Sequence, residues 1–274
     1  LEQQYGEWRQ SGPPPVFSDS EVITVALIID TYFHGNEELG LSFLRQYHSE
    51  LFPQLPSDGH FNERRTPLGR LIEQIRCWLT VQEGLLTTTD PVRLIDSAPI
   101  FVATYGRGGD NQTLTGHEYF GVASSHGAKV FGLRLDITTS HDQVIDQWML
   151  APASYHDSTT MPALVEDQND LLLIGDGAYH NPTVEPVLHH HHQIDVLAPP
   201  RQDSRLYAWS KAAIQTVARF RSPIESDFSV LATVFNIEYP QARSLHGLVS
   251  RIATRILAYT CSFVMNNYLA LLTG

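Results

Sequence analysis

The stretch that decides the fold is Leu171-Leu172-Leu173-Ile174-Gly175-Asp176-Gly177-Ala178-Tyr179. Four consecutive aliphatic residues without polar alternation predict a strand that is buried on both faces. The Gly-Asp-Gly sequence then allows a sharp turn, which places Asp176 at the carboxyl end of the strand, where open α/β sheets usually present ligands. Asp176 is therefore a candidate cation ligand. A simpler alternative stays open, because Asp in such a turn often only hydrogen-bonds its own backbone.

A second predicted strand, Val92–Ile100, carries an acid in its interior, Asp96. Asp is depleted in strands, and a buried carboxylate needs a partner or an ion. Other strands are expected at Val130–Thr139, at Val144–Leu150 as its hairpin partner, and at Ile194–Ala198. Between them, Thr104–Gly127 is rich in glycine and polar residues and is expected to form a loop.

Helices are expected on both sides of these strands. Ser18 and Glu21 form a capping-box pattern ahead of residues with helical apolar spacing. The remaining expected helices are Glu38–Leu51, Ser57–Gln82 with a break near Pro67, one that Asp157 or Ser158 caps, Arg205–Arg219, Pro223–Phe235 and Ala242–Leu272. This order predicts a mixed α/β sheet flanked by helices at residues 90–274, preceded by an all-helical domain at residues 1–89.

The composition limits the classes of function. The chain has 274 residues, 42% of them hydrophobic, and a formal net charge of −12, which argues against a general nucleic-acid binder. The charge is uneven, since residues 201–255 hold 8 Lys and Arg against 4 Asp and Glu. Any phosphate-binding surface is therefore expected in that segment. Two cysteines and no signal-peptide pattern favour a cytosolic protein.

Glu225 is a third candidate acid, in the sequence Arg221-Ser222-Pro223-Ile224-Glu225. Capping alone would explain it, because Ser222 suits an N-cap, Pro223 the first helical position, and Glu225 the acid of a capping box. Metal binding is compatible with that role. Three carboxylates that converge would repel one another unless cations neutralise them, and hard oxygen ligands of this kind select Mg²⁺ or Mn²⁺.

An ordered set of motifs across nearly the whole chain resembles the DDE transposases of bacterial insertion sequences, which have an RNase-H-like catalytic domain, and is most similar to the insertion-sequence 982 family. The motifs are Ser18–Thr24, Leu51–Pro56, Ile95–Pro99, Leu150–Ala153 with His156–Ser158, Gly175–Tyr179, Arg221 with Ile224–Glu225 and Phe228–Ser229, and Ala242–Ser244 with Gly247–Leu248. Each motif is weak alone, but their shared order is a strong signal.

The resemblance implies that Asp96, Asp176 and Glu225 are the catalytic triad and bind two Mg²⁺ ions, for which Mn²⁺ can substitute. Two ions about 4 Å apart are a known clamp for in-line attack on a phosphodiester. It also implies double-stranded DNA as partner, at element ends and target, a homodimer that pairs two ends, and a cytoplasmic, nucleoid-associated protein. The helical domain would then bind DNA ends or form the dimer.

Six basic residues are candidate DNA contacts: Arg107, Lys129, Arg219, Arg221, Arg243 and Arg251. Arg221 matches an arginine four residues before the acid that lies near DNA in related families, whereas ordinary surface positions remain an alternative for Arg107 and Lys129. The tract His189–His192 is interpreted as solvated surface rather than a metal site. The apolar run Ile256–Leu272 is interpreted as a buried helix, so no membrane partner is expected.

Two departures from the family leave alternatives open. Gly177-Ala178 replaces the Lys-Gly that often follows the second Asp, and Leu231-Ala232 stand where a lysine is common after the Glu. Both changes remove phosphate contacts, in line with the acidic charge. The alternatives are a transposase-derived DNA-binding protein that has lost catalysis, and another RNase-H-like nuclease that acts on RNA or hybrids.

Overall fold

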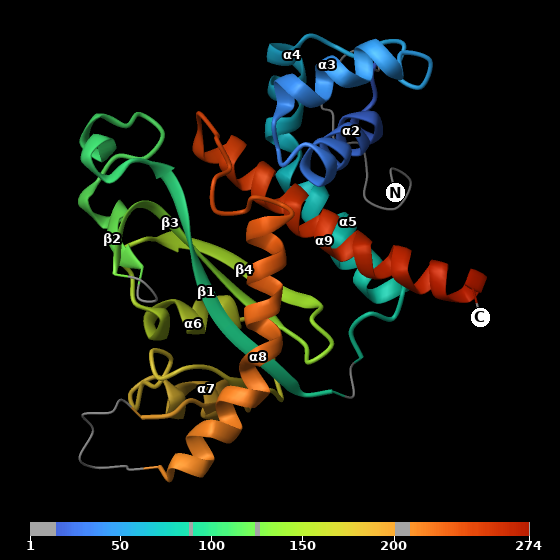
Figure 1. Ribbon diagram of the computed structural model, residues 1–274. Helices are drawn as coiled ribbons and strands as arrows, with labels where there is room; N and C mark the ends of the chain where they lie inside the picture. Colours follow the sequence, from blue (N-terminus) through green and yellow to red (C-terminus); the bar gives the residue numbers. More distant parts are fainter. Residues whose placement is uncertain (1–14, 88–89, 124–126, 201–208, 274) are drawn as a thin grey trace.

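A mixed β-sheet lies at the centre of the protein, with helices on both faces (Figure 1). The computed structural model describes residues 15–87, 90–123, 127–200 and 209–273. The strands are β1 Val92–Ala103, β2 Phe120–Ala123, β3 Ala128–Thr139, β4 Ile145–Pro152, β5 Leu172–Ile174 and β6 Asp195–Leu197. Their order is β2-β3-β1-β5-β6, and β4 also pairs with β3.

The sheet changes direction at β1. On one side, β1 runs antiparallel to β3, which forms an antiparallel hairpin with β4. On the other side, β5 and β6 continue the sheet in parallel. This arrangement confirms the predicted fold class, a mixed α/β sheet flanked by helices and preceded by helices, as well as the predicted hairpin.

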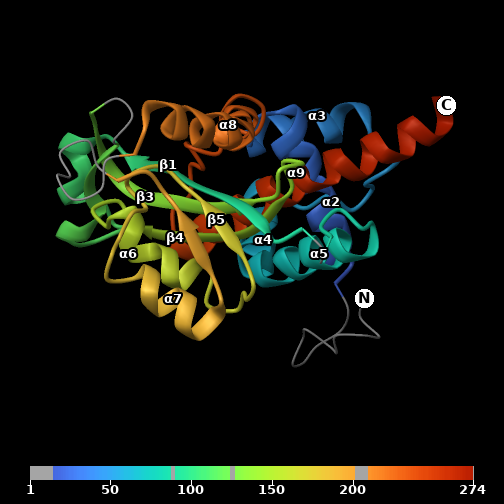
Figure 2. The same ribbon diagram turned by 90° about the horizontal axis from the view of Figure 1, so that it is seen from below.

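Alternate residues of β1 pack into different hydrophobic clusters, because side chains alternate across a strand. Leu94 belongs to the cluster that β1 shares with α8 (Lys211–Thr233) and α9 (Leu245–Thr273). Ile95 packs with α6 (Asp157–Leu164) and α7 (Glu185–His192) on the opposite face. Figure 2 shows α8 on one side of the sheet and α6 and α7 on the other. The sheet is therefore buried on both faces around β1 and β5.

The N-terminal helices pack against the C-terminal helix. They are α2 (Asp19–Tyr32), α3 (Glu37–Tyr47), α4 (Asp58–Arg65), a 3₁₀ turn (Thr66–Leu68) and α5 (Gly69–Gln82). The capping box at Ser18 and Glu21 is present, and the expected break near Pro67 is the 3₁₀ turn. Ala253 and Leu257 of α9 lie in the hydrophobic cluster of these helices. The boundary at residues 89 and 90 thus separates segments that share one core.

A buried ion-pair network joins the same helices. Arg65 contacts Asp30 at 2.5 Å and Glu37 at 3.0 Å. From α9, Arg251 contacts Glu37 at 2.6 Å and Arg255 lies 3.5 Å from Asp30. Because removal of one partner would leave a buried charge uncompensated, this network holds α9 against α2, α3 and α4.

α9 is long and apolar enough to cross a membrane, but 67% of its most apolar window is buried within the protein. It packs against α2 and α5. The predicted burial of the run Ile256–Leu272 is confirmed only at its start, because residues 256–260 are buried, whereas most side chains from Ser262 to Leu272 are exposed. Beyond this packed part, α9 projects from the body (Figure 1), and Met265, Tyr268 and Leu272 are exposed there.

Three element predictions were wrong. Residues 211–233 form one helix, α8, with Pro223 inside it, rather than helices that end at Arg219 and restart at Pro223; the first part of the former prediction, residues 205–208, lies outside the described residues. The N-cap of α6 is His156, whose side chain accepts from the Ser158 backbone, rather than Asp157 or Ser158. The predicted loop at Thr104–Gly127 contains β2 and two short 3₁₀ turns.

Candidate active site

Asp96 and Asp176 occupy equivalent positions on two adjacent parallel strands. β1 and β5 pair in register through Leu94 and Ile174, and each acid follows its paired residue by two positions. Because both strands run in the same direction, both carboxylates come to the same edge of the sheet, where Asp96 belongs to the face that α8 covers. The register therefore explains why two acids far apart in the chain meet.

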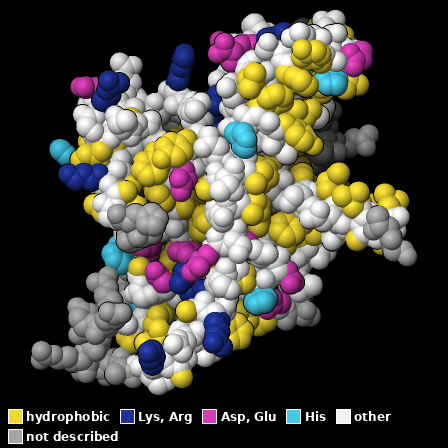
Figure 3. Space-filling view, in the orientation of Figure 1, with side chains coloured by type: hydrophobic (Ala, Val, Ile, Leu, Met, Phe, Trp, Pro, Cys, Tyr) yellow, Lys and Arg dark blue, Asp and Glu magenta, His cyan; other side chains and the backbone are white. Residues whose placement is uncertain are grey.

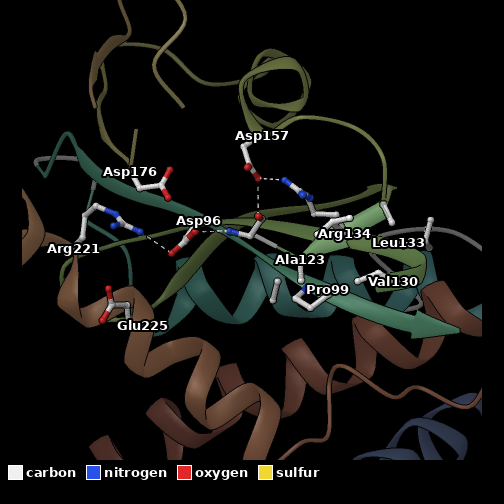
Figure 4. Close-up of a pocket in the computed structure, with 14 residues that line it drawn as sticks. Asp96, Pro99, Ala123, Val130, Leu133, Arg134, Asp157, Asp176, Arg221 and Glu225 are labelled. Carbon is white, nitrogen blue, oxygen red and sulfur yellow. Dashed lines mark hydrogen bonds and ion pairs between the residues drawn. The ribbon is translucent and has the colours of Figure 1, made fainter. Parts of the chain in front are cut away.

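Glu225 comes to the same edge from α8. The helix continues through Pro223, so Glu225 lies in its interior, and the capping-box interpretation of Glu225 was wrong. Arg221 precedes Glu225 by one helical turn and lies on the same helical face. Figure 4 shows the guanidinium of Arg221 directed from α8 toward Asp96, with Glu225 beside the same helix.

All three predicted acids line one cavity of about 340 Å³. Figure 3 shows acidic side chains gathered around a basic one beside α8. The cavity extends from the acids toward β2 and β3, where its wall is mainly apolar. The full lining is Asp96, Ser97, Ala98, Pro99, Val122, Ala123, Val130, Leu133, Arg134, Ala153, Asp157, Asp176, Arg221 and Glu225.

The two strand acids are held by backbone N–H groups. The Ser97 backbone N–H donates to Asp96 Oδ1 at 2.9 Å, and the Ala178 backbone N–H donates to Asp176 Oδ1 at 2.8 Å. The second bond is the local turn contact that was the alternative interpretation of Asp176. Since Asp176 also lines the cavity, it combines the turn contact with a position beside Asp96.

The pKa of Asp96 is raised above its ordinary value. Burial raises the pKa of Asp96 to about 6, the Arg221 guanidinium opposes that rise, and the carboxylates of Asp176 and Asp157 add to it. Arg221 Nη2 contacts Asp96 Oδ2 at 2.7 Å. Negative charge therefore accumulates at the cavity, with one arginine in direct contact with Asp96.

Arg134 and Asp157 also line the cavity, and the sequence analysis did not single out Arg134. The two side chains form an ion pair, and Ser97 Oγ donates to Asp157 Oδ1 at 2.7 Å. Asp157 had been interpreted mainly as a helix cap. An arginine between Leu133 and Leu135, in a strand expected to be half-buried, was the signal that could have identified this pair.

The candidate DNA contacts fall into three groups. Arg107, Lys129, Arg219 and Arg243 are exposed, and the Lys129 amine lies 5.4 Å from the centre of the Tyr105 ring. Arg221 lines the cavity. The prediction for Arg251 was wrong, because its side chain is only 7% exposed and is paired with Glu37. Arg201 and Arg205 lie outside the described residues.

The donor set at the cavity suits a hard divalent cation, since it consists of carboxylate oxygens. Within the described ranges, however, no three His, Cys, Asp or Glu side chains lie close enough together to hold a metal ion. The chain thus brings the three acids to one cavity without gathering their oxygens at one point. The tract His189–His192 lies at the surface on α7, where His189 contacts Asp195 at 2.9 Å.

No curated protein sequence matches this chain. Among solved structures, it is similar to a Mos1 transposase paired-end complex with left transposon end, at 11% identity and a TM-score of 0.25, covering 84% of this chain and 83% of that chain. The Mos1 strand transfer complex matches at 10% identity and a TM-score of 0.26, covering 95% and 81%. Likeness at this level does not identify equivalent residues.

The amino-acid sequence identifies the family of the chain. The model of the transposase DDE domain family matches residues 87–261, which include β1 to β6, α8 and all three candidate acids. The match spans well over half of the chain. The chain therefore belongs to the transposase DDE domain family.

Proposed function

We propose that this protein is a DNA transposase that cleaves DNA strands at the ends of an element and joins them to a target. The observation that carries the proposal is the cavity that Asp96, Asp176 and Glu225 line together. Family membership supports transposase chemistry in general. Origin from a bacterial insertion sequence, close to the insertion-sequence 982 family, is part of the proposal and rests on the sequence motifs.

Asp96, Asp176 and Glu225 would hold the divalent ions, Mg²⁺ or Mn²⁺. Two such ions, when bound, would supply a Lewis acid for the attacking oxygen and another for the leaving oxygen. The backbone N–H groups of Ser97 and Ala178 orient the two aspartates, each through the Oδ1 atom. The role of the acids would thus be to hold the cations that neutralise and position the reacting phosphodiester.

The Arg134–Asp157 pair borders the same cavity and fixes the position of Ser97 through its hydroxyl. Such support keeps β1 in place beneath the acids, and a rigid surrounding shell is what precise phosphoryl chemistry requires. The exposed Arg107, Lys129, Arg219 and Arg243 are proposed to contact phosphates of double-stranded DNA. A homodimer that pairs two element ends, in the nucleoid of the cytoplasm, completes the proposal.

The test is the Asp96→Asn variant. It should lose cleavage of element-end DNA by at least about a thousandfold, because a neutral amide is a poor ligand for a hard cation, while thermal unfolding stays close to that of the wild type. Asp167→Asn is the matched control, since Asp167 is exposed and lies outside the cavity. Undiminished cleavage by Asp96→Asn would refute the proposed active site.

A second candidate is a DNA-binding derivative without catalysis. The separation of the three carboxylates favours the loss of catalysis, and the net charge of −12 agrees with few phosphate contacts. Such a protein would bind DNA equally well with and without the Asp96→Asn substitution, and neither form would cleave. Its affinity would also depend weakly on salt, because few phosphate contacts release few counterions.

A further inference from the structure

The cation nearest the candidate triad is part of the protein itself. Arg221 Nη2 lies 2.7 Å from Asp96 Oδ2. In Figure 4 its guanidinium points at Asp96, with Asp176 and Glu225 on either side in this view. The guanidinium therefore lies against the Asp96 carboxylate, which a metal ion would need as a ligand. Its positive charge offsets part of the local negative charge.

The contact is placed where it competes with a metal ion for Asp96 and is partly shielded from water. The side chains of Arg221 and Asp96 are only 13% and 22% exposed, and an ion pair shielded from water is weakened less by solvent and salt than an exposed pair. While Arg221 contacts Oδ2 and the Ser97 N–H contacts Oδ1, both oxygens of Asp96 are engaged. A divalent ion would compete with the guanidinium for Oδ2.

The hydrogen-bond donors of Arg221 are also not all satisfied. Its Nε atom is buried and has no hydrogen-bond partner within the described residues. A buried donor without a partner is costly, so the guanidinium would gain from an anion that offers two oxygens. A DNA phosphate has that geometry, because phosphates accept bidentate contacts from arginine. In the observed state, Arg221 Nε thus lacks the hydrogen-bond acceptor that a DNA phosphate would supply.

We propose that Arg221 is an internal cation that occupies Asp96 in the DNA-free protein and transfers to a DNA phosphate, so that DNA and divalent metal bind cooperatively. This inference rests on the proposed function. When Arg221 leaves, Asp96 becomes available and the repulsion among the acids favours a metal ion. Linkage requires the reverse as well, so that bound metal strengthens DNA binding. The DNA-free protein would then bind divalent metal ions weakly and would have little catalytic activity until DNA is in place.

The experiment measures Mn²⁺ binding to the full chain at pH 8 by electron paramagnetic resonance of free Mn²⁺. Without DNA, Arg221→Ala should bind Mn²⁺ about tenfold more tightly than the wild type, within the usual range for coupled sites. Arg221→Gln should act in the same direction, and Arg221→Lys should stay near the wild type because it keeps the charge. A short mixed-sequence duplex at low salt should raise the affinity of the wild type but not that of Arg221→Ala.

Arg45→Ala is the matched control. Arg45 contacts Asp58 at the same 2.7 Å but lies on α3 at the surface, so this variant changes the net charge equally and should bind Mn²⁺ as the wild type does. Thermal unfolding identifies any variant that fails to fold, and Arg221→Gln then replaces Arg221→Ala in the comparison.

Two results would overturn the inference in different ways. If Arg221→Ala and Arg221→Gln bind Mn²⁺ no more tightly than the wild type, while Asp96→Asn abolishes binding, the metal site stands and Arg221 is only a structural partner. If no variant binds Mn²⁺, with or without the duplex, the metal site of the proposed function fails, and the inference fails with it.

Discussion

Asp136 is a fully buried carboxyl group behind the cavity. It lies on β3, and neither of its side-chain oxygens has a hydrogen-bond partner among the residues that the structure describes. Burial raises the pKa of Asp136 to about 7, and the negative charge of Asp157 adds to the rise. The group is therefore held in its protonated form in the folded protein at mildly acidic pH.

This acidity predicts how stability depends on pH. In the unfolded chain, Asp136 loses its proton near pH 4, whereas the folded protein retains it until about pH 7. The unfolded state binds fewer protons between these values, so the free energy of unfolding should fall as pH rises from 4 to 7, by up to about 1.4 kcal/mol per pH unit.

Urea unfolding of the wild type and Asp136→Asn across this range checks the prediction. The variant should show a flatter dependence, because an amide does not titrate. Asp96 and Asp227, whose pKa values are raised by burial to about 6, contribute with the same sign in both proteins. Equal slopes for the two proteins would show that Asp136 does not titrate in this range.

At the scale of single residues, the sequence was informative where an acid broke an apolar run. Asp96 and Asp176 were predicted as candidate ligands for that reason, and the structure places both at the cavity. Arg251 was misassigned because sequence does not reveal whether an arginine has a buried partner such as Glu37. Asp136 was overlooked because it fits the alternation of a half-buried strand, and the sequence does not show that α6 packs against β3.

Among the elements, α8 depends most on contacts with its neighbours. Proline in a helix interior removes one backbone hydrogen bond and tends to bend the helix, and in Figure 1 α8 changes direction along its length. Gln143 Nε2 donates to the Pro223 carbonyl at 3.2 Å, and Tyr259 Oη donates to Asp227 Oδ1 at 2.8 Å. The β3–β4 turn and α9 thus hold the segment that carries Glu225.

These contacts explain why the sequence predicted two helices where the structure has one. Ser222-Pro223 is a strong local signal for a helix start, and local rules contain no information about Gln143 or Tyr259. Because distant residues stabilise the bend, the chain continues as a helix through the proline. The strands were easier to predict, since a run of apolar residues in the sequence directly indicates a buried strand.

Tyr259→Phe is the test of this support. Removal of the hydroxyl leaves Asp227 buried with one partner fewer, which should lower the free energy of unfolding by about 1 to 3 kcal/mol. Tyr268→Phe is the matched control, because Tyr268 lies on the same helix and is 53% exposed. Thermal and urea unfolding of both variants give the comparison; similar stability for the two would mean that the Tyr259–Asp227 bond does not hold α8.

At the scale of the whole molecule, the helices before the sheet and the helix after it form one unit. Gly69 of α5 lies against Ser250 of α9, where an added Cβ would approach the Ser250 backbone to 3.2 Å. Ser250 Oγ donates to the Arg65 carbonyl across 185 residues of sequence. The helical content before residue 90 was predicted, but its partner was not, because an amphipathic helix does not reveal which surface it covers.

A fragment of residues 90–274 tests the predicted domain boundary. Without the N-terminal helices, α9 would expose Ala253 and Leu257 and leave Arg251 and Arg255 without Glu37 and Asp30. We expect the fragment to be largely insoluble, and coexpression of residues 15–87 to restore soluble material. The soluble fraction and the unfolding temperature are the measurements. A soluble fragment that unfolds cooperatively at the temperature of the full chain would establish residues 90–274 as an independent domain.

The pairing of early helices with α9 also affects how the chain folds during synthesis. Asp30 and Arg255 are 225 residues apart, so at ordinary translation rates the first helices leave the ribosome roughly 10 to 45 s before their partner. During that interval the parts of α2 and α5 that pack on α9 have no covering surface and are available to chaperones. Nascent chains that stop before α9 would remain open to proteolysis, which couples the synthesis of α9 to the first appearance of a closed core.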